Sequence, residues 1–190
     1  GRVYWVLAIA YFNIGNADDS RPAARTALEL CQQAGDQYGI GNALNILSFS
    51  DTDLVENIQH VQQALQAFET VGYVDRQSAV IGNLANAYLE LGLYPHGRRL
   101  YTAGVEIARR IGAKVGLGVT LGNLITTELV LSMTVSARSQ VAEFTEIVIA
   151  LGDPTQDSTL AFTLGELALA KGDPKSAVRH LKAALEIDHQ

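Results

Sequence analysis

The sequence predicts an all-α protein of ten helices, arranged as five antiparallel pairs. Three observations support this class. Glycines recur with a period of about 40 residues, the segments between them have helical periodicity, and sustained strand alternation is lacking. Asn-Gly and Asp-Gly pairs, the strongest hairpin signals, are also missing from the sequence.

Glycines mark the predicted helix ends. A glycine directly after a helix adopts the left-handed conformation at low cost, because it has no Cβ atom. Two interleaved sets follow apolar helical runs: Gly35, Gly72, Gly112 and Gly152, and then Gly15, Gly92 and Gly172. Two helix ends in each period indicate two helices per repeat. We therefore expect one domain with repeats at 1–35, 36–72, 73–112, 113–152 and 153–190.

The glycines at the helix ends define most of the first three helix pairs. The first pair ends its helices at Gly15 and Gly35. In the second pair Thr52 stands where the turn glycine is expected, and Gly72 ends the second helix. The third pair has clear helical spacing at i, i+4, i+7, i+8 and i+11, in Val80, Leu84, Ala87, Tyr88 and Leu91.

The last two pairs differ in the strength of their signals. In the fourth pair Ser132 occupies the turn position and Glu128 replaces an expected tyrosine, so a distorted or longer turn stays open there. In the fifth pair, Asp153–Pro154 and Asp173–Pro174 each place an N-cap acceptor before a proline at the first helical position. This arrangement predicts two sharply started helices.

The last repeat carries the most specific motif. Residues 164–187 read LGELALAKGDPKSAVRHLKAALEI, with small residues where two helices would cross and a glycine at the turn. This segment closely resembles a tetratricopeptide repeat, and the first and third repeats have the same pattern. The long period is similar to that of the repeats in kinesin light chains and bacterial regulator proteins. HEAT-type repeats share this length and remain the alternative.

The resemblance implies an α-solenoid whose first helices line a concave groove. In kinesin light chains and bacterial peptide-sensing regulators, asparagines on these helices grip the backbone of an extended peptide. The asparagine amide both donates and accepts hydrogen bonds, so it can pair with any peptide backbone. We therefore predict a binding groove formed by Asn42, Asn83, Asn86, Asn123, Phe49 and Glu166. The alternatives are asparagines that cap turns or bridge repeats, and phenylalanines that pack in the core.

The motif GNL occurs twice, at residues 82–84 and 122–124. Gly82 and Gly122 are predicted to lie inside first helices, where glycine costs about 1 kcal/mol relative to alanine. This cost indicates a close approach at each glycine. Either a neighbouring helix or the backbone of a ligand could make that approach.

Charge and composition limit the kinds of partner and the cell compartment that we expect for this chain. The net charge of −6 disfavours direct nucleic-acid binding, and no uncharged apolar run reaches the roughly 18 residues that a membrane span needs. The single cysteine, Cys31, excludes an internal disulfide and is expected in the core. The lack of disulfides fits a reducing compartment, so we expect a cytoplasmic protein.

Catalytic motifs are not found in the sequence. The four histidines have no ligand partner at metal-binding spacing, and the sequence has neither a Gly-x-Ser-x-Gly motif nor a phosphate loop. We therefore expect no enzyme activity, no cofactor and no metal. An enzyme stays open only if a pocket with perturbed titratable groups exists.

Two functions remain. The first is a protein- or peptide-binding scaffold. The second is an oligomerisation or intramolecular regulatory domain of a bacterial transcription regulator or nucleotide cyclase, because the chain looks like a piece of a longer protein and has no polar capping helix. In that second case a homodimer would form through the terminal repeat.

Overall fold

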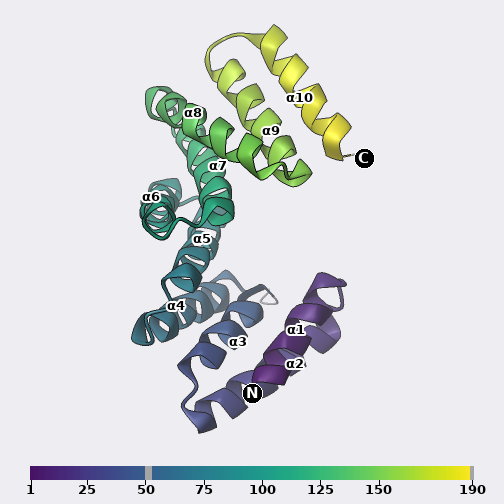
Figure 1. Ribbon diagram of the computed structural model, residues 1–190, viewed down its shortest axis with the longest axis vertical. Helices are drawn as coiled ribbons and strands as arrows, with labels where there is room; N and C mark the ends of the chain where they lie inside the picture. Colours follow the sequence, from purple (N-terminus) through teal and green to yellow (C-terminus); the bar gives the residue numbers. More distant parts are fainter. Residues whose placement is uncertain (50–52, 189–190) are drawn as a thin grey trace. The chain divides into compact units, whose positions relative to one another are not determined.

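The computed structural model describes residues 1–49 and 53–188, and within these ranges it consists of ten helices without a strand (Figure 1). The predicted all-α class is therefore confirmed. The helices are α1 (Arg2–Asn13), α2 (Ala17–Ala34), α3 (Gln37–Phe49), α4 (Leu54–Thr70), α5 (Val74–Glu90), α6 (Tyr94–Ile111), α7 (Lys114–Val130), α8 (Thr134–Leu151), α9 (Pro154–Ala170) and α10 (Pro174–Asp188). None of these helices has the length and apolar character needed to cross a membrane.

The chain forms two compact units, residues 1–91 and 92–190, which are described separately. In the first unit each of the helices α1 to α5 packs on the next, and in the second the same holds for α6 to α10. First helices also contact one another, α1 with α3 and α7 with α9. This arrangement brings side chains about 40 residues apart in sequence onto neighbouring helices. The division into five repeats of one domain stays a prediction.

Small residues lie where the helices cross. Ala8, Ala24 and Ala27 are fully buried in the core of α1 to α3, together with Trp5 and Ile46. Cys31 is likewise buried, as predicted, and burial raises the pKa of its thiol. Trp5 is a core residue and is 8 % exposed. The predicted crossings of small residues therefore form the core of the first unit.

The helix ends confirm the glycine pattern. All seven predicted stops have a positive φ between 59° and 73°. Asp153 and Asp173 are N-caps, as expected. Their side chains accept hydrogen bonds from the backbone N–H groups of Thr155 at 3.0 Å and Ser176 at 3.1 Å. Thr52, the unusual turn residue of the second pair, lies outside the described residues.

The fourth pair keeps a regular turn although it lacks the glycine. Ser132 has φ 58°, so a serine adopts the left-handed conformation that glycine has elsewhere. The backbone N–H groups of Ser132 and Met133 donate to the carbonyls of Leu129 and Glu128 at 2.9 and 2.8 Å. The turn at Gly172 has the same two-bond pattern. The tertiary fold therefore enforces the turn on an unfavourable residue.

We expect Ser132→Gly to stabilise the protein by about 0.5–1 kcal/mol. The left-handed conformation costs an L-residue about 1–2 kcal/mol, and the added freedom of glycine in the unfolded chain offsets part of the gain. Urea unfolding monitored by circular dichroism measures the change. The control is Ser139→Gly on the exposed surface of α8, which should destabilise by about 0.5 kcal/mol. A loss of stability in Ser132→Gly would contradict the argument.

Candidate functional site

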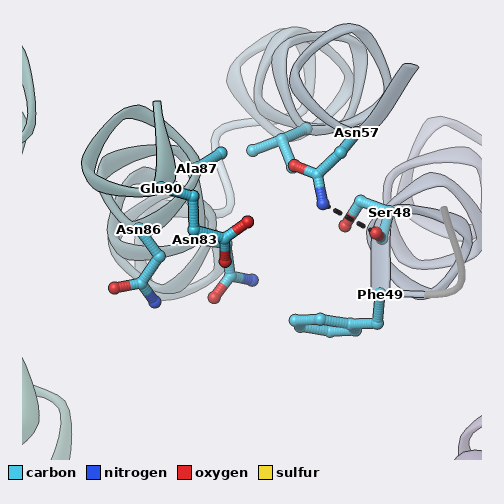
Figure 2. Close-up of a pocket in the computed structure, with 8 residues that line it drawn as sticks. Ser48, Phe49, Asn57, Asn83, Asn86, Ala87 and Glu90 are labelled. Carbon is cyan, nitrogen blue, oxygen red and sulfur yellow. Dashed lines mark hydrogen bonds between the residues drawn. The ribbon is translucent and has the colours of Figure 1, made fainter. Parts of the chain in front are cut away.

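An open pocket of about 230 Å³ lies in the first unit, between α3, α4 and α5. Figure 2 shows Asn83, Asn86 and Glu90 on one side of the pocket and Phe49 on the other. The lining residues are Ser48, Phe49, Asn57, Val61, Asn83, Asn86, Ala87 and Glu90. Three of the six predicted groove residues therefore meet in one place.

The α5 side of the pocket is set by helical spacing. Asn83, Asn86, Ala87 and Glu90 lie at i, i+3, i+4 and i+7, so they share one face of the helix. The opposite face of α5 is buried at Ile81, which is 8 % exposed, and at Ala85, which is fully buried. The same amphipathic pattern that anchors the helix therefore presents the polar residues to the pocket.

Asn83 bridges two first helices. Its Nδ2 atom donates to Oδ1 of Asn45 on α3, at 2.8 Å. Both residues are half-buried. Asn83 therefore behaves as in the alternative that we gave above, in which an asparagine bridges neighbouring repeats. Because Asn83 also lines the pocket, the bridge holds its amide in place at the pocket wall.

Asn57 is a pocket residue that the sequence did not reveal. It lies on α4, the second helix of its pair. Its Nδ2 atom donates to the carbonyl oxygen of Ser48 at 2.7 Å. Its Oδ1 atom is buried without a hydrogen-bond partner among the described residues. The only sequence signal is its position in the first turns of α4, four residues after the N-cap Asp53.

Phe49 is exposed at the end of α3. Its side chain is 47 % exposed and stacks on Phe12, which is 42 % exposed, with ring centroids 5.2 Å apart. The core-packing alternative therefore does not hold for this pair. Two neighbouring first helices present an aromatic surface next to the amides of α5.

Asn42 lies elsewhere, which corrects the prediction that it faces the groove. It is only 4 % exposed, and its Nδ2 atom donates to the carbonyl oxygen of Tyr38 at 2.7 Å. It lies three residues before the half-buried Asn45, on the same side of α3, but packing in the fold buries it. Its amide completes a hydrogen bond inside the protein and is not accessible to a ligand.

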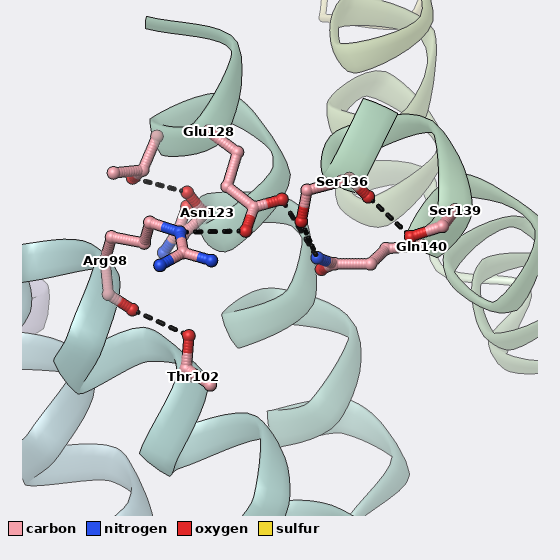
Figure 3. A network of polar contacts seen from close by, with 8 residues as sticks. Arg98, Thr102, Asn123, Glu128, Ser136, Ser139 and Gln140 are labelled. Carbon is pink, nitrogen blue, oxygen red and sulfur yellow. Dashed lines mark hydrogen bonds and ion pairs between the residues drawn. The ribbon is translucent and has the colours of Figure 1, made fainter. Parts of the chain in front are cut away.

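The remaining two predicted residues belong to the second unit. Asn123 is half-buried on α7, close to the ion pair of Arg98 and Glu128 (Figure 3). Glu166 on α9 accepts a hydrogen bond from the Thr126 hydroxyl at 3.1 Å. Burial raises the pKa of Glu166, and the hydrogen bond from Thr126 lowers it by a smaller amount. Neither residue lines the pocket of the first unit.

The two GNL glycines have different surroundings. A Cβ atom on Gly122 would lie 3.0 Å from Cζ of Phe144 and 3.5 Å from Cγ2 of Thr159, so packing against neighbouring helices explains this glycine. A Cβ atom on Gly82 would have no other atom within 4 Å. Gly82 lies one turn before Asn86 on α5, so backbone is open to approach beside the pocket.

Within residues 1–49 and 53–188, no group of three His, Cys, Asp or Glu side chains is placed to hold a metal ion. Burial raises the pKa of Tyr101 to about 12. Tyr101 is a core residue of the second unit and is 1 % exposed. The described residues of the pocket supply three amides, one carboxylate, one hydroxyl, one aromatic ring and two aliphatic side chains.

No protein-family model and no curated protein matches the sequence. Solved structures do match it. BtubC from P. vanneervenii is 18 % identical with a TM-score of 0.81, and the match covers 98 % of this chain and 78 % of that one. The kinesin light chain TPR-like repeats of Podosopora anserina are 14 % identical with a TM-score of 0.75, over 98 % of this chain and 94 % of that one.

A Rap protein in complex with competence and sporulation factor is also similar. It is 14 % identical with a TM-score of 0.82, over 97 % of this chain and 52 % of that one. The chain thus spans about half the length of this Rap protein. Together these structures confirm that the chain has a tetratricopeptide-like helical repeat fold.

Proposed function

We propose that this chain is a non-catalytic scaffold that holds an extended peptide or partner segment along its first helices. The observation that carries the proposal is the pocket of the first unit, where the amides of Asn83 and Asn86 lie opposite the exposed ring of Phe49. The similar Rap structure, with its bound competence and sporulation factor, supports a binding role for this fold.

The chemistry of the pocket suits an extended backbone. A buried peptide must satisfy its N–H and C=O groups, and asparagine offers both a donor and an acceptor. The bridge from Asn83 to Asn45 fixes one of these amides before a ligand arrives, which reduces the entropy lost on binding. The open space at Gly82 lets a ligand backbone come close to α5.

We expect the double variant Asn83→Ala/Asn86→Ala to bind extended peptides about tenfold more weakly, because two hydrogen bonds contribute about 0.5–1.5 kcal/mol each. Fluorescence anisotropy with mixed-sequence synthetic peptides measures the affinity. The control is Gln62→Ala/Gln66→Ala, which removes two exposed amides from α4 outside the pocket. Unchanged affinity in a folded asparagine variant would refute the groove.

The second candidate function is an oligomerisation or intramolecular regulatory domain. One observation favours it: α9 and α10 enclose a mostly apolar groove of about 650 Å³. Phe162 and Leu185 line this groove and are 46 % and 58 % exposed. Sedimentation of the protein used for the peptide experiment separates the two candidates. A strict monomer at high concentration would count against self-association through the terminal pair.

A further inference from the structure

We propose that the pocket between α3, α4 and α5 receives an arginine side chain of the bound segment. The inference rests on the proposed scaffold function and specifies what the pocket selects. It is carried by three properties of the pocket: its charge, the direction of its hydrogen bonds and its aromatic wall.

Among the described residues, the pocket wall has one charged side chain. This is Glu90, which is exposed at the end of α5. No lysine, arginine or histidine is among the described residues that line the pocket. A cationic ligand group would form a charge-assisted hydrogen bond with this carboxylate, whereas an acidic group would be repelled.

Two amides of the pocket, those of Asn57 and Asn83, donate hydrogen bonds to other protein atoms. The Nδ2 atom of Asn57 donates to Ser48, and the Nδ2 atom of Asn83 donates to Asn45. The Oδ1 atom of Asn57 has no hydrogen-bond partner among the described residues. One N–H group of each amide is thus used inside the protein, and the Asn57 oxygen and the Glu90 carboxylate are acceptors for a group that only donates. Guanidinium has five N–H donors and no acceptor.

The ring of Phe49 distinguishes between the two basic side chains. Its ring lies across the pocket from the α5 residues (Figure 2), and nearly half of the side chain is exposed although the ring also stacks on Phe12. A planar guanidinium stacks on an aromatic face while its edge donates to a carboxylate. An ammonium ion is more strongly hydrated and lacks the planar fork.

The volume of the pocket also suits a single arginine side chain. Its volume is about 230 Å³, which lies below the roughly 300–1,000 Å³ of pockets that enclose whole small molecules. A single long side chain fills such a space, while the rest of the peptide runs past it over Gly82 and Asn86. The pocket is therefore a specificity site within a longer groove.

The test uses pools of short synthetic peptides that differ at one fixed central position and are mixed elsewhere. That position is arginine, citrulline, lysine or glutamate. Citrulline has nearly the shape of arginine without its charge. We expect the arginine pool to bind at least about tenfold more tightly than the citrulline pool, because hydrogen bonds to charged groups are the strong ones.

The variant Glu90→Gln should remove the preference for arginine over citrulline. The control Glu69→Gln changes an exposed carboxylate on α4 that does not line the pocket, and it should keep the full preference. Equal binding of all four pools, with weaker binding in Asn83→Ala/Asn86→Ala, would overturn the arginine inference and keep the scaffold function. Binding of no pool would overturn both.

Discussion

Replacement of Arg98 by alanine is expected to destabilise the second unit by about 3–5 kcal/mol, the usual cost of leaving a buried charge without its partner. The Arg98 Nε atom on α6 donates to Oε1 of Glu128 on α7 at 3.0 Å. The Glu128 side chain is only 1 % exposed. Gln140 on α8 donates to its other carboxylate oxygen at 2.9 Å (Figure 3).

The expected loss of stability is large because Glu128 is buried, whereas Arg98 is partly exposed. Arg98 is about one-third exposed, so water can still solvate part of the guanidinium, but Glu128 has almost no access to solvent. Without Arg98, Gln140 would be the remaining hydrogen-bond donor to the carboxylate among the described residues. Urea unfolding, monitored by circular dichroism, measures the loss in the Arg98→Ala variant.

Arg109 provides a matched control on the same helix. Its Nε atom donates to Oε1 of Glu143 at 2.9 Å, but both side chains are more than one-third exposed. Arg109→Ala should therefore change stability by less than about 1 kcal/mol. Equal losses in the two variants would show that burial of Glu128 does not decide the effect.

Replacement of Gly41 by alanine is expected to destabilise the first unit by about 2–3 kcal/mol through overpacking. A Cβ atom at this position would lie 2.7–2.9 Å from three ring atoms of Phe68. Phe68 is 1 % exposed on α4 and packs against the ring of Tyr38, with centroids 5.9 Å apart. The ring cannot withdraw without disturbing its neighbours.

Gly82→Ala is the control for Gly41→Ala. It makes the same chemical change in a first helix of the same unit, but the added methyl group meets open space. We expect a gain of about 1 kcal/mol from the better helix propensity of alanine. Urea unfolding of both variants gives the comparison. A loss of stability in Gly41→Ala together with a gain in Gly82→Ala would support the packing argument. A loss of stability in Gly82→Ala would contradict it.

The sequence predicted much of the candidate site but not all of it. Asn83, Asn86 and Phe49 were found from composition and from the resemblance to peptide-binding repeats. Asn42 was wrongly included, because residues three positions apart share one side of a helix and only the packing of α3 shows that Asn42 is buried while Asn45 is half-buried. Asn57 was missed because the way a second helix starts, relative to the end of α3, is a property of the tertiary structure.

The sequence alone determined the helices and their ends, because backbone preferences of glycine, proline and N-cap residues act locally. It also determined the period and therefore the fold class. The tertiary structure decided the left-handed turn at Ser132, the burial of Glu128 against Arg98, and the different surroundings of Gly82 and Gly122. The last two features depend on residues that are far apart in the sequence and meet only when the helices pack, and the turn at Ser132 lies between two helices that pack on each other. Local backbone preferences do not encode such contacts.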